Sequence, residues 1–353
     1  MKIVQALGSA RKGGAERFFI RLADALHRRG IEQTVIVRRG HWAQAQLRDQ
    51  GVPTKGVFFA GKLDLLTRRI FRQTLIATNA DIVLTWMRRA TAACPEGPWV
   101  HVGRLGNYYS LKSYSHCDHL VGITPGIIDH IKTGGWPANK VSLIPNFVPD
   151  FAASPSSRAA LNTPADRPLI LWLGRMEHEK GPDIVVRALA KIPDAYLWMG
   201  GSGSFEGDVK AIASELGVLD RVRFLGWRDD IHALLAAADL YVCASRFEAH
   251  GNIILEAWAH GLPIVSARSP GPEHLIEHGR TGLLVANDDP EAMAAALNNL
   301  IANPDLAGKI AAAGHDHFKA TYSEDAIVTM YVELFQRLVA EKAPRAPNRV
   351  TTT

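Results

Sequence analysis

The stretch that decides the fold class is Ser245–Ser266, SRFEAHGNIILEAWAHGLPIVS. Gly251 permits a sharp backbone turn before a helix that is apolar on most sides, and Pro263–Val265 is a short apolar strand soon after that helix. Helices that alternate with buried apolar strands are typical of parallel sheets. The stretch therefore predicts a doubly wound α/β domain.

The same alternation of strands and helices extends along the chain in both directions. In the second half, the predicted strands are Leu169–Leu173, Ala195–Met199, Val222–Leu225 and Leu240–Cys243. In the first half, they are Lys2–Leu7, Thr34–Val37, Asp81–Thr85, Trp99–Val102 and His119–Gly122. The clearest predicted helices are Ala15–Arg29, Lys62–Thr78, Gly126–Thr133 and Glu324–Val339. The pattern predicts two doubly wound, Rossmann-like domains.

A chain of 353 residues is long enough for two such domains. We expect an N-terminal domain over residues 1–150 and a C-terminal domain over 151–322, with a Pro-, Ala- and Ser-rich linker at Pro149–Pro168. Residues 323–341 are predicted to form a helix that returns to the first domain, and residues 343–353 a disordered tail. Because open α/β sheets bind ligands beyond their strand ends, we expect the site in a cleft between two facing domains.

Composition excludes several classes of protein. No apolar run reaches the roughly 18 residues that a membrane-spanning helix needs, and the start MKIVQAL has no cleavage-site pattern of a secretory signal. Cys94, Cys117 and Cys243 lie too far apart for a metal motif and are predicted to be buried. These observations predict a cytoplasmic globular protein.

Charge is distributed unequally between the two halves. Residues 1–150 hold 21 Lys and Arg against 10 Asp and Glu, a net +11, whereas the rest carries −6 of the total +5. Four arginine pairs belong to the basic half, at Arg28-Arg29, Arg38-Arg39, Arg68-Arg69 and Arg88-Arg89. This excess indicates an anionic partner. We do not expect that partner to be a nucleic acid, because the sequence has neither a recognisable nucleic-acid-binding module nor a stacking aromatic platform.

Two segments of the second half contain the candidate ligand-binding residues. In the first, Gly174 and Arg175 follow a strand, and Lys180 stands before Gly181-Pro182 at a helix start, where free N–H groups favour phosphate. The alternative is an ordinary basic loop.

The second segment contains two glutamates, Glu248 before a helix and Glu256 inside it. Carboxylates can accept hydrogen bonds from the hydroxyl groups of ribose or another polyol. The alternative makes Glu248 a helix cap and Glu256 a solvated residue, but the apolar neighbours of Glu256 predict a buried helix, where a carboxylate needs a partner.

These motifs together resemble a family 4 glycosyltransferase (glycosyltransferase group 1) of the GT-B fold, of the bacterial envelope or lipopolysaccharide type. The chain has G-R-x-x-x-x-K-G at Gly174–Gly181 and E-x7-E at Glu248–Glu256. It also has GGAE at Gly13–Glu16, LIPNFV at Leu143–Val148 and RTGLLV at Arg280–Val285.

The resemblance implies hexosyl transfer from a nucleoside diphosphate sugar with retention of configuration, without a cofactor or a bound metal. It implies that Arg175 and Lys180 hold the diphosphate, that Glu256 binds the ribose, and that Glu248 contacts the transferred sugar. The catalytic residues would be Arg175, Lys180 and Glu248. The donor-binding residues would be Gly14, Gly174, Arg175, Lys180, Glu248, His250, Gly251, Asn252, Ile253 and Glu256.

The acceptor side departs from the family pattern. Many relatives have a histidine just after a strand of the N-terminal domain, whereas here His101 falls within the strand and Arg104 where a loop is expected to begin. His101 is either the equivalent residue or a core histidine. We predict acceptor contacts at Gly13, His101, Arg104, Tyr108 and Lys112, because arginine and lysine suit an anionic acceptor.

The predicted acceptor is an anionic glycan or a lipid-linked saccharide, such as a growing lipopolysaccharide core at the inner face of the cytoplasmic membrane. Lys62–Thr78 combines leucines with arginines and is either an interfacial helix on anionic lipid or a core-facing one. A nucleotide-sugar 2-epimerase and a non-catalytic sugar-nucleotide-binding protein are the alternative functions. The glycines at Gly200–Gly203 lack the spacing of a dinucleotide fingerprint, which argues against an oxidoreductase.

Overall fold

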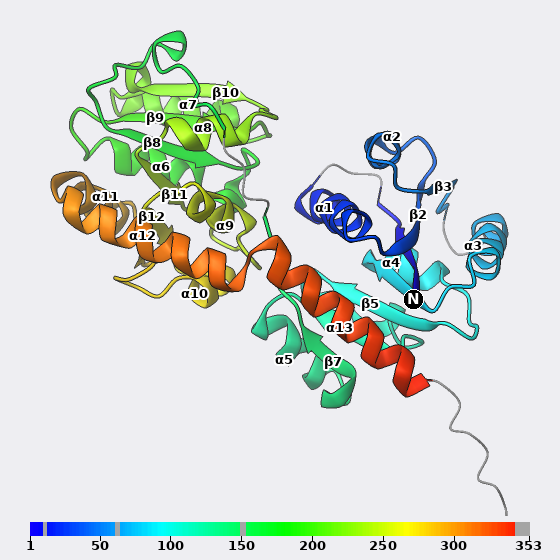
Figure 1. The fold of residues 1–353 in the computed structure, drawn as a ribbon. Helices are drawn as coiled ribbons and strands as arrows, with labels where there is room; N and C mark the ends of the chain where they lie inside the picture. The colour runs from blue at the N-terminus through cyan, green and yellow to red at the C-terminus, as the bar shows by residue number, and fades with distance from the viewer. Residues whose placement is uncertain (10–12, 61–63, 149–152, 343–353) are drawn as a thin grey trace, which may run out of the picture. The chain divides into compact units, whose positions relative to one another are not determined.

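The computed structural model describes residues 1–9, 13–60, 64–148 and 153–342. These residues form two compact units, coloured by residue number in Figure 1. Unit 1 contains Met1–Pro145 and the segment from Ile327 on, and unit 2 is Asn146–Ala326. The predicted tail at 343–353 lies outside the described residues, as do residues 62–63 of the predicted helix Lys62–Thr78 and residues 149–152 of the predicted linker.

Unit 1 is built on a parallel sheet of seven strands in the order β3-β2-β1-β4-β5-β6-β7. The strands are β1 (Lys2–Leu7), β2 (Glu32–Arg38), β3 (Thr54–Val57), β4 (Ile82–Trp86), β5 (Val100–Leu105), β6 (His119–Gly122) and β7 (Val141–Leu143). The helices are α1 (Gly14–Arg28), α2 (Trp42–Asp49), α3 (Leu65–Ala77), α4 (Met87–Ala93), α5 (Pro125–Thr133) and α13 (Glu324–Lys342).

Helices cover both faces of this sheet because its central strands are apolar on both sides. β4 is buried along its whole length. On one face, Phe71 of α3 and Ala90 of α4 pack with Val4 and Val83. On the other face, Phe18 and Phe19 of α1 pack against Trp86. The helix predicted over Ala15–Arg29 is confirmed as α1.

The last helix, α13, belongs to unit 1 from Ile327 on. Tyr331 of α13 is fully buried, and its hydroxyl oxygen accepts a hydrogen bond of 3.0 Å from Arg104 Nε on β5. Arg29 donates to the Thr329 hydroxyl over 2.8 Å. The chain therefore returns to unit 1 after completing unit 2.

Unit 2 is built on a parallel sheet of six strands in the order β10-β9-β8-β11-β12-β13. The strands are β8 (Leu169–Leu173), β9 (Tyr196–Gly200), β10 (Val222–Gly226), β11 (Leu240–Cys243), β12 (Ile264–Ala267) and β13 (Leu283–Val285). The helices are α6 (Pro182–Leu189), α7 (Glu206–Glu215), α8 (Ile231–Ala237), α9 (Asn252–Ala259), α10 (Pro270–Leu275), α11 (Pro290–Ala302) and α12 (Pro304–Thr321).

Both sheets have the doubly wound strand order, in which the direction of winding reverses beside the first strand. The reversal lies between β1 and β4 in unit 1 and between β8 and β11 in unit 2. Loops that leave two such strands diverge in opposite directions, so a crevice opens at the carboxyl ends of the strands. In unit 2, this crevice is where the loops after β8 and β11 begin.

The segment predicted as a linker is largely part of unit 2. Ser156 N–H donates to the Ala233 carbonyl over 2.8 Å, and Arg158 Nη2 contacts the Ala237 carbonyl and the Asp239 carboxylate, each at 2.7 Å. These hydrogen bonds hold residues 156–168 against the unit although they contain only a short 3₁₀ turn at Ala159–Leu161. The prediction of a linker through Pro168 is therefore wrong for its second half.

Several short elements were not predicted from the sequence, among them α2, α4, β3 and β13. Each is short, and β3 (TKGV) has only one buried residue, so its hydropathy pattern is weak. The three cysteines are free and buried, as predicted. Among the described residues, no helix is long and apolar enough to cross a membrane.

Candidate functional site

In unit 2, the loop after β8 and the loop after β11 are in backbone contact. Gly181 has a φ of +62°, and a Cβ atom there would lie 2.0 Å from the Ala244 carbonyl oxygen. Only glycine fits this position, because both the left-handed backbone and the close approach exclude a side chain. Pro182 then opens α6 at a position that tolerates proline.

This backbone contact brings Lys180 and Glu248 together although they are 68 positions apart in the sequence. Lys180 Nζ lies 2.6 Å from Glu248 Oε2, and each side chain is 20 % exposed. Burial by itself raises the pKa of Glu248. The Lys180 ammonium and the backbone N–H groups of Gly251 and His250 outweigh that effect, so the pKa lies below the ordinary value of 4.5.

Arg246, which the sequence analysis did not single out, fixes the two loops relative to each other. Its Nη1 and Nη2 atoms contact the two oxygens of Asp183 in α6 at 2.9 and 2.8 Å. Its backbone N–H donates to the Glu179 carbonyl over 2.9 Å, and Nη1 also donates to the His178 carbonyl. No spacing in the sequence indicates this network, because its members come from separate strand ends.

The turn before α9 is held by close backbone packing. Gly251 has a φ of +83° and its N–H donates to Glu248 Oε1 over 3.2 Å. The Glu248 carbonyl accepts from Gly271 N–H of α10 over 2.8 Å. A Cβ on Gly271 would lie within 2.7 Å of the His250 backbone, so α10 closes tightly on this turn.

The first residues of α9 and the glutamate inside it are also positioned within unit 2. The Asn252 side-chain oxygen accepts from Asn146 Nδ2 over 2.5 Å, which connects the turn to the LIPNFV segment. Glu256 lies one turn further along α9 and is 6 % exposed, so the prediction of a buried helix around it is confirmed. Ile253 is partly buried in the same helix.

Gly174 and the glycines after β9 serve backbone packing. Gly174 N–H donates to the Gly200 carbonyl over 3.0 Å, and a Cβ on Gly201 would lie 1.7 Å from the Gly174 carbonyl oxygen. A Cβ on Gly203 would lie 2.3 Å from the Met176 carbonyl oxygen. Close backbone packing therefore accounts for glycine at these positions, and a dinucleotide-binding role is not needed to explain them.

Arg175 extends into solvent beside this packed turn. Its side chain is 59 % exposed, and its nearest ion-pair partner is Glu179, at 4.0 Å. A guanidinium so weakly held can turn to an anionic ligand at little cost. Unit 2 thus presents two cationic side chains, Arg175 and Lys180, on the loop after β8, and two carboxylates, Glu248 and Glu256, near the start of α9.

The predicted acceptor residues lie in unit 1, and so does Gly14, which was predicted to bind the donor. Gly13 is the N-cap of α1 and Gly14 its first residue. His101 lies in β5 and is 4 % exposed, with Nε2 2.9 Å from the Thr85 hydroxyl. Burial, with a smaller effect of nearby His116, lowers the pKa of His101 to about 3, so the ring is neutral at neutral pH. The structure favours the core-histidine interpretation.

The prediction that a loop begins at Arg104 is wrong. Arg104 lies within β5 and is 3 % exposed. Its guanidinium carbon is 4.2 Å from the Trp86 ring centre and 4.7 Å from that of Phe18. Through this stacking and its hydrogen bond to Tyr331, Arg104 connects β5 to α1 and α13. The position was mispredicted because a buried arginine in a strand looks like the start of a polar loop.

Tyr108 and Lys112 follow in the loop after β5 and are exposed. The Tyr108 ring packs edge-on against His130 of α5, with 5.7 Å between ring centres. Lys112 lies in a 3₁₀ turn, η1 (Leu111–Ser113). Of the predicted acceptor residues, these two present polar groups to solvent.

Two doubly wound α/β units, each built on a parallel sheet, define the GT-B fold class. Comparison with known proteins agrees. The family model described as "Glycosyl transferases group 1" matches residues 154–317, and that described as "Glycosyltransferase Family 4" matches residues 12–150. The chain belongs to this glycosyltransferase family.

Two relatives from Rhizobium meliloti (strain 1021) are similar over nearly their whole length. The lipopolysaccharide core biosynthesis glycosyltransferase LpsE is 36 % identical, over 91 % of this chain and 95 % of its own. The lipopolysaccharide core biosynthesis glycosyltransferase LpsD is 34 % identical, over 94 % of this chain and 97 % of its own. Anabaena HepE, crystallised with UDP and glucose, has a TM-score of 0.83 at 20 % identity, covering 96 % of this chain and 100 % of HepE.

The depressed pKa of Glu248 predicts a pH-dependent contribution to stability. Because the folded-state pKa lies below the unfolded value of about 4.5, the contribution is complete above pH 4.5 and is lost as the pH falls below it. Glu248→Gln should therefore lower the free energy of unfolding by about 1.5 kcal/mol at pH 7 and by much less at acidic pH.

Urea unfolding of the wild type and the variant over this pH range measures the difference. Glu215→Gln, at the exposed end of α7, is the matched control and should follow the wild-type curve. A Glu248→Gln variant whose stability deficit is the same at pH 7 and below pH 4 would contradict the Lys180–Glu248 pairing.

Proposed function

We propose that this glycosyltransferase moves a hexosyl residue, with retention of anomeric configuration, from a nucleoside diphosphate sugar to a glycan or lipid-linked acceptor. The acceptor is proposed to be a lipopolysaccharide core or another cell-envelope polysaccharide. Relatives named for lipopolysaccharide core biosynthesis support this class over a 2-epimerase or a non-catalytic binding protein.

The observation that carries the donor proposal is the Lys180–Glu248 contact at the switch point of unit 2. A departing diphosphate needs positive charge, and Lys180, Arg175 and the N-terminal amides of α9 supply it within one unit. A lysine ammonium has three N–H donors, so Lys180 can bind phosphate oxygen while it still contacts Glu248. We propose that these groups stabilise the leaving group without a bound metal ion.

The glutamates have the chemistry to hold the two sugars of the donor. Glu256, buried in α9, is proposed to accept hydrogen bonds from the ribose hydroxyl groups, and Glu248 from hydroxyls of the transferred sugar. His250 and Asn252 lie between them in the chain and are proposed to line the same site. HepE, whose fold is similar, has been crystallised with UDP-glucose, which supports a sugar nucleotide as the donor.

Replacing the cationic group at the leaving diphosphate should slow transfer. We expect Lys180→Ala to lower kcat/KM by about 10- to 150-fold, since a hydrogen bond to a charged group contributes about 1.5–3 kcal/mol. Transfer to truncated lipopolysaccharide from a strain lacking this protein would be measured with EDTA present, and NMR of the product would give the anomeric configuration.

Lys191→Ala is the matched control, because Lys191 is half exposed and its ion-pair partner is Glu291 of α11. This variant should keep wild-type kcat/KM. Equal activity of Lys180→Ala and wild type would remove the diphosphate assignment. A product of inverted anomeric configuration would contradict the proposed retaining mechanism. Loss of activity in EDTA would contradict the proposal that no metal ion is needed.

We also propose that unit 1 meets an anionic membrane surface at the inner face of the cytoplasmic membrane. Leu65 and Leu66, in the first turn of α3, are 75 % and 50 % exposed, and Arg69 and Arg72 on the same helix are exposed. Exposed leucines beside arginines match a helix that inserts apolar side chains between anionic headgroups. This arrangement favours the interfacial interpretation for the start of the helix.

Vesicle sedimentation tests the membrane proposal. Vesicles containing phosphatidylglycerol should bind the protein more tightly than neutral phosphatidylcholine vesicles, and the Leu65→Ser, Leu66→Ser double variant should bind at least about tenfold more weakly. The exposed pair Leu216 and Leu219 of unit 2 provides a matched control double variant. Equal binding to both lipids, or equal losses in the two double variants, would contradict the proposal.

A further inference from the structure

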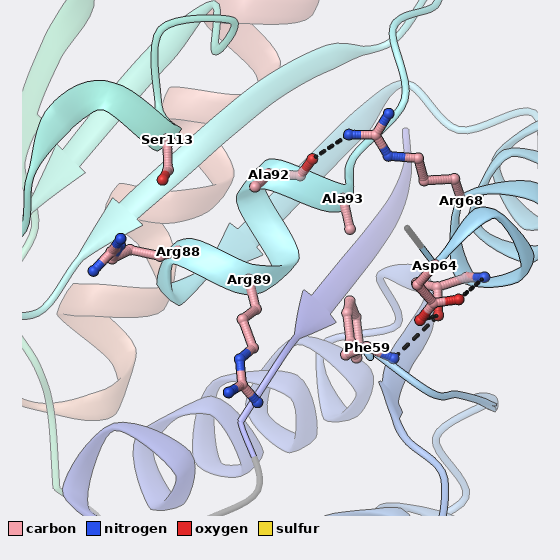
Figure 2. A pocket seen from close by; sticks show the side chains of 9 residues that line it. Phe59, Asp64, Arg68, Arg88, Arg89, Ala92, Ala93 and Ser113 are labelled. Carbon is pink, nitrogen blue, oxygen red and sulfur yellow. Dashed lines mark hydrogen bonds between the residues drawn. The ribbon is translucent and has the colours of Figure 1, made fainter. Parts of the chain in front are cut away.

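Unit 1 contains a cavity of about 450 Å³, a size within the range of small-molecule sites. Figure 2 shows that its walls come from the loop after β3, the start of α3, helix α4 and the turn η1. It is lined by Phe59, Asp64, Thr67, Arg68, Arg88, Arg89, Ala92, Ala93 and Ser113. The lining residues thus come from segments that follow β3, β4 and β5 in the chain.

Three arginines give the cavity a positive lining. Arg88 and Arg89 are exposed, and within the described part of the chain no carboxylate forms an ion pair with either of them. Arg68 donates one N–H, from Nη2, to the Ala92 carbonyl over 3.1 Å, which leaves its other donors available. The positive charges around the cavity repel each other, so an anion that binds there reduces this electrostatic repulsion.

The carboxylate in the wall, Asp64, forms no ion pair with these three arginines in the described part of the chain. Asp64 caps α3, and its Oδ1 accepts from Thr67 N–H over 2.8 Å. Its Oδ2 accepts from the Thr67 hydroxyl over 2.6 Å and from Ala60 N–H over 2.7 Å. The hydrogen bond from the Thr67 side chain has the largest effect on the pKa of Asp64, which lies below its usual value. Three local hydrogen bonds thus hold Asp64 in place and leave acceptor capacity on its carboxylate.

The lining is mixed in a way that suits a saccharide. The guanidinium groups of Arg68, Arg88 and Arg89 are spread around α4 instead of meeting at one point, as Figure 2 shows. Between them lie the small apolar Ala92 and Ala93, against which the C–H face of a sugar ring can pack. Ser113 and remaining acceptor capacity on Asp64 can meet sugar hydroxyl groups. A single small anion would use only part of such a lining.

We infer that this cavity binds an acidic saccharide, one whose sugars carry carboxylate or phosphate groups, as part of the acceptor. Guanidinium groups bind both anions through paired hydrogen bonds, and this shared geometry is what the three arginines offer. The inference rests on the proposed function only in assigning the saccharide as acceptor, because binding itself requires no sugar transfer.

Calorimetric titration of the full chain, without any sugar nucleotide, tests this site. The probes are oligogalacturonate against its neutral methyl ester, and a phosphorylated, lipid-free core oligosaccharide against the same compound after dephosphorylation. The Arg88→Gln, Arg89→Gln double variant should raise the Kd for the bound acidic probe at least about tenfold. The Arg187→Gln, Arg337→Gln variant removes the same charge from exposed residues outside the cavity lining and should leave that Kd unchanged.

The outcomes separate the possible ligands and the two proposals. Tight binding of only one acidic probe identifies carboxylate or phosphate as the recognised group and supports the site. Failure of both acidic probes, equal binding of the neutral forms, or equal losses in both double variants would overturn it. A loss of vesicle binding but not of saccharide binding in the Arg88→Gln, Arg89→Gln variant would also overturn it, in favour of lipid. Wild-type protein that binds the saccharide but transfers no sugar would instead contradict the proposed function.

Discussion

In unit 2, the backbone of Gly181 lies against the carbonyl group of Ala244, and the donor-side arrangement depends on this contact. A Cβ on Gly181 would be 2.0 Å from that oxygen, so the loops after β8 and β11 approach as closely as two backbones can. The doubly wound strand order makes the approach available, because β8 and β11 are neighbours at the point where the winding reverses. Lys180 and Glu248 come within 2.6 Å as a consequence.

Arg246 converts this proximity into a fixed geometry. It bonds to Asp183 of α6, to carbonyls of η4 (His178–Lys180) and to Asp288, so the helix after β8 cannot move independently of the loop after β11. Preorganised charges of this kind stabilise a transition state with little reorganisation during the reaction. On this account, the residues that hold the site in shape matter as much as those proposed to touch the donor.

Unit 1 is organised around a different buried charge. Arg104 lies between Phe18 and Trp86 and bonds to Tyr331, so α13 is joined to β5 and α1. This arginine is therefore accounted for by packing. The positive charge of the first half that remains at the surface includes Arg68, Arg88 and Arg89, which line one cavity. The basic residues of the first half thus have one structural use, at Arg104, and two proposed uses, in lipid contact at α3 and in ligand binding at the cavity.

Sequence patterns predicted the long apolar elements well and the local geometry poorly. β1, β8 and β11 match their predicted bounds because most of their residues are apolar, and β8 and β11 are continuous apolar runs. Arg104 was misplaced because its burial depends on α1 and α13, which are distant in the sequence. The pairing of Lys180 with Glu248 follows from strand order, which hydropathy does not report. The arginine pairs were visible in the sequence, but the cavity required the tertiary structure.

The central claim is that unit 2 binds a nucleoside diphosphate sugar through Lys180. Thermal unfolding in the presence of UDP-, GDP- and ADP-sugars tests it most directly, because a ligand at about 100 times its Kd stabilises the folded state by about 2.7 kcal/mol. The account predicts that at least one of these sugars raises Tm by about 5 °C or more, and that Lys180→Ala loses most of the rise. No rise with any of the three, or the same rise in wild type and Lys180→Ala, would contradict it.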